Sequence, residues 1–304
     1  MISVIPPDRM RITRSAIAAM AALVSLAGGA RGQGGAGGGE GGAPADTTDP
    51  VSGIAARPIN GGFAATIPDD WMQGRTSYGG FSAALALVAA QQLAPDLPPL
   101  RSATVNFVGP LAGEVEVRAK VLRRGRNASW ISAEVANESG VGLTATFVFM
   151  GPVEASSLHL HDVPMPAYTV PRDEAIPLPE RAGPSFAPNF ERRFAQPRSE
   201  EKVPEILWWE KLKDTAGLDP MVALVLLADA LPPGVMPLTG SVPISSMTWL
   251  VNLLTPLPQT DDGWFLLQAL GNYAEKGCSS QNMAIWNTRG EAVAVGMQSI
   301  AVFG

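Results

Sequence analysis

The same pattern occurs twice in this chain, in GEVEVRAKVLRRGRNASWISAEVANESGVGLTATFVFMG (residues 113–151) and in GWFLLQALGNYAEKGCSSQNMAIWNTRGEAVAVGMQSIAVFG (residues 263–304). Each copy has a strand that begins after a glycine, a glycine-marked turn, a second strand, an Asn-x-x-Gly turn and a long apolar strand. A pattern that recurs along a chain indicates two copies of one structural unit. The sequence therefore predicts two related α+β units that face each other across a shared groove.

A predicted helix precedes the strands of each unit. In the first unit, Tyr78-Gly79-Gly80-Phe81 opens a helix that runs to about residue 93, with apolar residues at helical spacing. In the second unit, Asp219-Pro220 is typical of an N-cap and a first helical position, and Pro232-Pro233 ends the helix. The expected strands lie near 62–67, 101–108, 113–124, 128–137 and 141–150, and then near 191–195, 205–213, 243–254, 263–274, 278–287 and 291–303.

The strand expected at 113–124 shows the pattern of a half-buried antiparallel strand. Its apolar residues, from Val115 to Val121, alternate with charged residues from Glu114 to Lys120. A helix packed on a curved antiparallel sheet is an α+β arrangement.

The composition limits the classes of partner. The chain has 304 residues, of which 46% are hydrophobic and 16% charged, so it can bury sizeable cores. Its net charge is -6 and it has no basic block, which argues against a nucleic-acid partner. Its one cysteine, Cys278, excludes an internal disulfide framework and is expected to be a small core residue.

The chain divides into four expected segments. Residues 1–50 form a leader, because three arginines precede the apolar run 16–27 and a Gly/Ala-rich stretch follows. This shape is typical of a secretory signal, although a non-native extension or a disordered leader explains it as well, and the run is too short to span a bilayer. The folded units are then expected at 51–153 and 191–304. We expect a cytoplasmic location, with export left open by the signal-like segment.

The segment 154–190 is rich in proline, has no steady periodicity and is interpreted as a linker between the units. It contains the only histidines, His159 and His161. A His-x-His pair can bind a metal, but no cysteine or carboxylate cluster accompanies it, so solvated linker residues are the expected reading and no metal site is predicted.

Several short motifs, taken in order, resemble one known family. They are Tyr78-Gly79-Gly80-Phe81, Phe107-x-x-Pro110 with Gly113, Gly125-Arg126, the helix end Ala228-Asp229-Ala230, and Gln298 in the last strand. Together they resemble the double-hotdog acyl-CoA thioesterases of the acyl-CoA thioesterase II type and their thioesterase-like relatives. The resemblance covers residues 60–304 and is weakest across the Pro-rich linker. It implies a double hotdog, in which each unit has a central helix wrapped by a curved antiparallel sheet.

The resemblance also implies a catalytic site. In the family, an Asp on the second helix, a Thr on the next strand and a Gln on the last strand hold a water. These roles carry over to Asp229, to Ser246 and to Gln298, with Ser245 and Thr248 as competitors for the hydroxyl. The expected substrate-binding residues are Tyr78, Gly79, Gly80 and Thr248.

The residues themselves fit such chemistry. A carboxylate can accept a proton from water while a hydroxyl and an amide orient that water. Asp229 follows an uncharged stretch, so burial is expected to raise its pKa, unless it lies solvated at the helix end. Gln298 is surrounded by apolar residues and is either buried with partners or on the wet face of an edge strand. Gly79 and Gly80 bring backbone N–H groups close to an acyl carbonyl or a phosphate, or form only a tight turn.

The expected function is hydrolysis of an acyl-CoA thioester by direct attack of water, with no metal or redox cofactor and no membrane span. A homo-oligomer is left open. A hydratase or dehydratase on the same fold would need a histidine, and no histidine lies outside the linker. A non-catalytic protein that binds acyl ligands stays as the alternative, because a fold does not by itself carry an activity.

Overall fold

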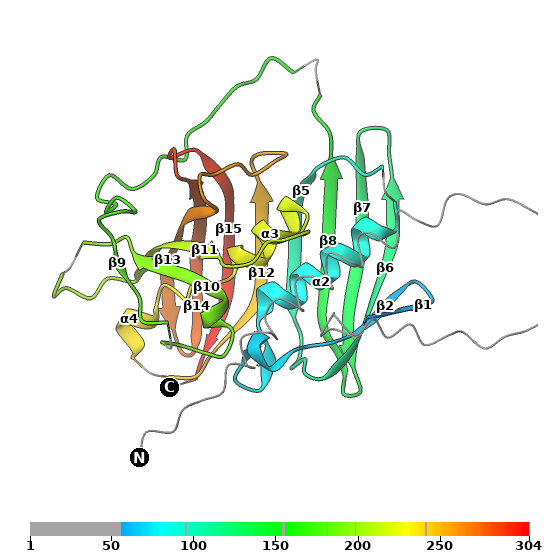
Figure 1. The fold of residues 1–304 in the computed structure, drawn as a ribbon, viewed down its shortest axis with the longest axis horizontal. Helices are drawn as coiled ribbons and strands as arrows, with labels where there is room; N and C mark the ends of the chain where they lie inside the picture. Colours follow the sequence, from blue (N-terminus) through cyan, green and yellow to red (C-terminus); the bar gives the residue numbers. More distant parts are fainter. Residues whose placement is uncertain are drawn as a thin grey trace, which may run out of the picture.

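The computed structural model describes residues 56–303 except 95, 154–155, 181, 198 and 241. Within these residues, thirteen antiparallel strands form one large sheet (Figure 1). Across the sheet they are β1 (Arg57–Ile59), β2 (Gly62–Thr66), β6 (Glu114–Arg124), β7 (Ala128–Asn137), β8 (Gly140–Met150), β5 (Leu100–Phe107), β12 (Ile244–Leu253), β15 (Ala292–Val302), β14 (Cys278–Asn287), β13 (Trp264–Glu275), β11 (Glu205–Leu212), β10 (Phe190–Phe194) and β9 (Ile176–Pro177). The expected leader, residues 1–50, lies outside the described residues.

The two halves of the sheet have the same strand order. Counted from the outer strand inward, the first half reads β2, β6, β7, β8, β5, and the second half reads β11, β13, β14, β15, β12. The halves join where residues 102–106 of β5 pair with residues 248–252 of β12. Gly277 and Gly290, which mark the predicted turns of the second half, have φ of 79° and 78°. Glycine adopts this left-handed conformation without strain, so these turns end the strands where the sequence indicates.

Two helices lie on the same side of this sheet, α2 (Gly79–Gln92) over β6–β8 and α3 (Pro220–Ala228) against α2 and β11 (Figure 1). Both helices are apolar over most of their surface, because one side packs on the sheet and another side on the neighbouring helix. The side chain of Asp219 caps α3 by accepting from the backbone N–H groups of Met221 and Val222 at 2.9 and 3.1 Å. The predicted N-cap is therefore confirmed.

The two helices run antiparallel. At the end of α2, Nε2 of Gln91 donates to Oδ1 of Asp219 at the start of α3, at 3.3 Å. At the other end, the first glycines of α2 lie against Asp229, the residue that follows α3. A long-range contact of this kind places the end of one helix beside the beginning of the other.

The Pro-rich segment does more than connect the halves, which the sequence analysis did not predict. It contributes β9 to the sheet edge, and Val163, Met165, Val170 and Ala175 pack over a second apolar cluster on the second half. The indole N–H groups of Trp209 and Trp286 donate to its backbone carbonyls at 2.9 and 2.8 Å. Figure 1 shows this green segment running from β8 to the half that holds β9–β11. Because proline lacks an N–H donor, such a segment covers a sheet face without showing a strand or helix period.

Cys278 is exposed, which contradicts its expected place in the core. It is the first residue of β14 and pairs with Glu275 directly beyond the hairpin turn. Alternation along β14 buries Ser279 and Gln281 and places Cys278 on the opposite face with Asn282, so its position in the strand makes it exposed.

Candidate active site

Asp229 lies where the end of α3 meets the beginning of α2. A Cβ atom added to Gly79 would lie 2.5 Å from Oδ2 of Asp229, and one added to Gly80 would lie 2.6 Å from the carbonyl oxygen of Leu226. Only glycine therefore permits this approach. The backbone N–H of Gly80 donates to the Asp229 carboxyl. The positive end of α2 thus faces a carboxylate, an arrangement that stabilises negative charge.

Gln298 reaches the same carboxyl from β15. Its Nε2 donates to Oδ1 of Asp229 at 2.6 Å, although 68 residues separate them in the sequence. Gln298 is buried, with only 4% of its surface exposed, which excludes the wet-face alternative. The expected proximity is present, but the amide bonds the carboxylate directly where the family pattern implies a shared water.

The environment of Asp229 changes its proton affinity. Burial raises the pKa of the Asp229 carboxyl to about 7, and the hydrogen bonds from Gln298 and from the Gly80 N–H oppose part of this rise. Desolvation penalises the charged carboxylate, and donors favour it. The carboxyl therefore exchanges its proton near neutral pH, which is the range that suits a general base.

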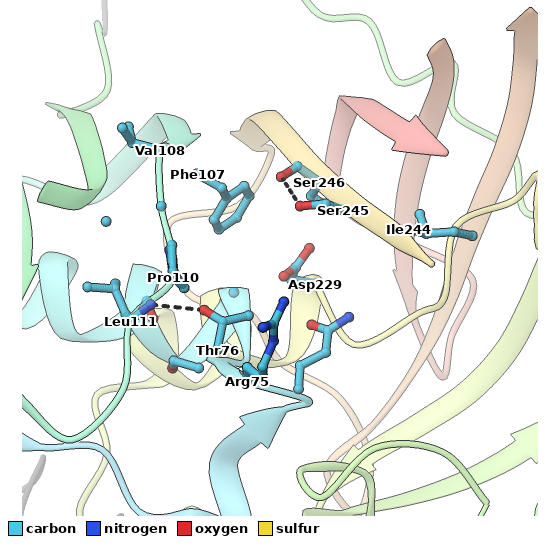
Figure 2. Close-up of a pocket in the computed structure, with 16 residues that line it drawn as sticks. Arg75, Thr76, Phe107, Val108, Pro110, Leu111, Asp229, Ile244, Ser245 and Ser246 are labelled. Carbon is cyan, nitrogen blue, oxygen red and sulfur yellow. Dashed lines mark hydrogen bonds between the residues drawn. The ribbon is translucent and has the colours of Figure 1, made fainter. Parts of the chain in front are cut away.

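A cavity of about 430 Å³ opens onto this carboxyl. It is lined by the turn between β3 (Met72–Gln73) and β4 (Thr76–Ser77), by the start of α2, by residues 107–111, and by residues 244–246 of β12. Figure 2 shows Asp229 between Ser245–Ser246 on one side and Arg75–Thr76 on the other. Elements from both halves therefore build the cavity, as the predicted shared groove requires.

A bulge in β12 separates the two candidate hydroxyl residues. Ser246 lies opposite Ile300, whereas Thr248 lies opposite Ser299, so Met247 is an extra residue between two paired positions. Ser246 lines the cavity, and Thr248 is exposed and does not line it. Ser246 and Thr248 therefore face opposite sides of the strand, although they are two residues apart, because an added residue reverses the alternation beyond it. Thr248 is not placed to contact a substrate in this cavity.

Tyr78 has a different role from the expected one. It is buried, its hydroxyl donates to the carbonyl of Leu226 at 2.7 Å, and its ring stacks on Phe186 with 4.1 Å between centroids. It does not line the cavity. Tyr78 thus ties the start of α2 to α3 and to the Pro-rich segment, because the turn before the helix directs its ring inward.

Two residues were missed by the sequence analysis. Arg75 is exposed on the β3–β4 turn and lines the cavity. Gln281 on β14 is 1% exposed and donates to Gln298. Gln281 had a detectable signal, since a polar residue there interrupts an apolar face shared with Met283 and Ile285. Arg75 had none, because an arginine in a Gly-containing turn is ordinary.

The described residues contain no group of three or more His, Cys, Asp or Glu side chains that could hold a metal ion. His159 and His161 are exposed, and neither lines the cavity around Asp229. Over the same part of the chain, no helix has the length and apolar character needed to cross a membrane.

Solved structures define the class of this fold. A hot dog fold protein of unknown function from Alicyclobacillus acidocaldarius matches with a TM-score of 0.69 and 21% identity, over 82% of this chain and 96% of that chain. The acyl-CoA thioesterase II TesB2 from Mycobacterium marinum matches with a TM-score of 0.65 and 17% identity, over 82% and 95% of the two chains. The TesB protein of Mycobacterium avium subspecies paratuberculosis gives 0.65 and 19%, over 82% and 96%. The protein is therefore a hotdog-fold protein.

Family models make this assignment more specific. The model of the acyl-CoA thioesterase N-terminal domain matches residues 67–150, and that of the C-terminal domain matches residues 169–302. The chain belongs to this acyl-CoA thioesterase family, which confirms the resemblance in its sequence motifs. No curated protein sequence matches the chain.

Proposed function

We propose that the protein hydrolyses acyl-CoA thioesters, with Asp229 as the general base that activates a water. The observation that carries the proposal is the Asp229 carboxyl, which has a pKa raised to about 7 and opens onto a cavity built by both halves. We further infer that residues 51–153 and 191–304 are tandem hotdog units, each with its helix wrapped by half of the sheet. The separate family models for the two parts and the repeated strand order support this division.

The proposed reaction proceeds in two steps. In the first, Asp229 takes a proton from water while the water oxygen bonds to the thioester carbon, which gives a tetrahedral oxyanion. In the second, the C–S bond breaks, the coenzyme A thiolate leaves and the proton on Asp229 returns to sulfur. The Ser246 hydroxyl is assigned to orient the water, and the positive end of α2 to stabilise the oxyanion. Because the base must be deprotonated, hydrolysis should fall as the pH drops through about 7.

Arg75 suits the charged part of such a substrate. Among the described residues that line the cavity, it is the only cation, and its side chain extends toward the open space below Asp229 in Figure 2. An exposed guanidinium binds phosphate through several N–H donors. We assign Arg75 to the phosphates of coenzyme A, and the acyl group to the apolar part of the cavity around Phe107.

The alternative is a protein that binds acyl-CoA without hydrolysing it. One observation favours it. Gln298 donates directly to Asp229, and so uses a donor that the family pattern assigns to the water. Measurements of binding and of turnover on the same preparation separate the two functions.

The test uses the full chain and a panel of acyl-CoAs of different chain length. Thiol release reports hydrolysis, against a substrate-free blank because Cys278 is exposed, and calorimetry reports binding. Asp229→Asn should lower kcat by about 10²–10⁴-fold, the usual contribution of a general base, while binding persists. Asp262→Asn is the matched control, because Asp262 is exposed in a turn with φ of 54°, where asparagine is tolerated. Wild-type turnover in Asp229→Asn would remove the base assignment, and binding without turnover by the wild type would favour the alternative.

A further inference from the structure

Three buried groups form a hydrogen-bonded chain that ends on Asp229. The backbone N–H of Gly234 donates to Oε1 of Gln281 at 2.8 Å. Nε2 of Gln281 donates to Oε1 of Gln298 at 2.9 Å, and Nε2 of Gln298 donates to Asp229 at 2.6 Å. Gln281 and Gln298 are 1% and 4% exposed, so water does not replace these partners easily.

The direction of this chain is fixed at its first member. A backbone N–H can only donate, so Gln281 must turn its carbonyl oxygen toward Gly234 and its NH₂ group toward Gln298. Gln298 must then turn its own oxygen toward Gln281 and its NH₂ group toward Asp229. An unanchored glutamine amide has two orientations that differ little in shape, and only one of them places a donor on the carboxylate.

Position 234 has room for glycine only. A Cβ atom at this position would lie 2.6 Å from the carbonyl oxygen of Ala269 and 2.7 Å from the backbone nitrogen of Gly271. These are backbone atoms of β13, which cannot move aside cheaply. The absence of a side chain therefore allows the Gly234 N–H to reach Gln281 beneath the sheet surface.

The other half of the molecule has apolar residues at the positions that correspond to Gln281 and Gln298. The strand pairs β5–β8 and β12–β15 each carry a bulge, which aligns Ile300 with Phe149 and Gln298 with Phe147. Gln298 lies opposite Gln281, and Phe147 lies opposite Ile131. Ile131 and Phe147 are both fully buried. The fold is thus satisfied by two apolar side chains here, and two buried amides cost desolvation that packing alone does not require.

We infer that Gln281 is a positioning residue, which sets the amide orientation of Gln298 so that Gln298 donates to Asp229. This inference rests on the proposed function only for its kinetic consequence. The orientation itself has a consequence that is independent of turnover, because losing a donor disfavours the charged carboxylate of Asp229.

The first test measures the titration of Asp229 directly. Protein labelled with ¹³C in its aspartate carboxyls is titrated by NMR, and Asp229→Asn assigns the resonance. In Gln281→Met, which keeps the length of the side chain and removes its amide, the pKa of Asp229 should rise by about one unit. Ile131→Val is the matched control, since it disturbs the corresponding buried position in the first half and should leave this pKa unchanged. An unchanged pKa in folded Gln281→Met would overturn the inference.

The second test is kinetic and covers the case in which Gln281→Met does not fold. Gln281→Met combined with Gln298→Met leaves no unpaired amide and reproduces the apolar pair of the first half. If Gln281 acts only through Gln298, this double variant should hydrolyse acyl-CoA at the rate of Gln298→Met alone. A further tenfold fall in kcat in the double variant would contradict the inference. If the wild type does not hydrolyse acyl-CoA, the proposed function fails, while the titration of Asp229 still decides the role of Gln281.

Discussion

At the scale of single residues, the candidate site combines groups whose chemistry depends on burial. Asp229 is partly buried, and three influences set the charge of its carboxyl: the Gly80 N–H, the Gln298 amide and its removal from water. The donors favour the carboxylate, and the desolvation opposes it. The balance places the pKa near neutrality, where a modest change of one neighbour changes the protonation state.

The bulge in β12 leads to a prediction about the hydroxyl residues. Ser246 lines the cavity and Thr248 does not, so Ser246→Ala should lower kcat by about tenfold, since orienting a water contributes less than accepting its proton. Thr248→Val, which keeps the branched shape on the exposed face, should leave kcat within about twofold. Steady-state kinetics on both variants decide the matter. The opposite ranking would place the reacting water on the other side of the strand.

Glu210 provides a prediction about stability and pH. It is fully buried on β11, and neither of its carboxyl oxygens has a hydrogen-bond partner within the described structure. Burial raises its pKa to about 8, and the nearby Arg192 opposes part of the rise. Because the folded state holds this proton more tightly than the unfolded chain, the contribution to stability is complete below about pH 4.5 and is lost as the pH rises to about 8.

Glu210→Gln should therefore remove the part of the pH dependence of stability that Glu210 contributes. Each unit of pKa shift corresponds to about 1.4 kcal/mol, so the wild type should lose several kcal/mol of unfolding free energy across this window. Asp229 contributes with the same sign up to about pH 7, so the comparison is sharpest between pH 7 and pH 8.5. Urea unfolding of the wild type and of Glu210→Gln at several pH values measures how the unfolding free energy depends on pH. Equal slopes in this range would show that Glu210 does not titrate in the folded protein.

At the scale of elements, α3 depends on a cap that also holds it against α2. Asp219 accepts from two backbone N–H groups of α3 and from Gln91 of α2. Asp219→Ala should lower the unfolding free energy by about 1–2 kcal/mol, as the loss of an N-cap usually does. Asp219→Asn keeps an oxygen acceptor and should cost less. Chemical denaturation checks both values, and a loss below about 0.3 kcal/mol in Asp219→Ala would mean that the cap is replaced by water.

The elements also show how far the sequence predicts the structure. Strands between glycine turns, such as β14, were placed to the residue, because Gly277 and Gly290 can adopt φ angles that other residues avoid. The bulge at Met247 could not be predicted, since an extra residue in a strand leaves no mark in the alternation on either side of it. The packing of Val163 and Val170 was missed for a related reason, because a proline-rich covering segment has no period of its own.

The site residues also divide into those that the sequence predicts and those that it does not. Asp229 and Gln298 were found through short motifs, and the structure brings them together. Gln281 was overlooked although it interrupts an apolar strand face, and its contacts with Gly234 and Gln298 could not be predicted because they join a loop and two strands. Tyr78 was assigned to the substrate because it precedes the glycines, yet its ring is buried and stacks on Phe186, and its hydroxyl donates to the carbonyl of Leu226.

At the scale of the whole molecule, the two halves share one continuous sheet and a pair of contacting helices. A change buried in the first half should therefore destabilise both. Phe147→Leu should lower the melting temperature while calorimetry still shows one transition, since β5 pairs with β12 and α2 packs on α3. Asp262→Asn should melt as the wild type does. Two resolved transitions in Phe147→Leu would show that the halves unfold independently.

The ends of the sheet limit how copies of this protein can associate. The outermost described strands, β1 and β9, are three and two residues long, and each contains a proline, Pro58 and Pro177. Proline offers no N–H to an incoming strand, and a strand this short presents few free groups. Both edges of the described sheet therefore disfavour the addition of a strand from another copy of the chain. For the part of the chain that the structure describes, we therefore expect a homo-oligomer to be joined through loops or through the broad faces of the sheet, because an added strand would find few free backbone groups at either end.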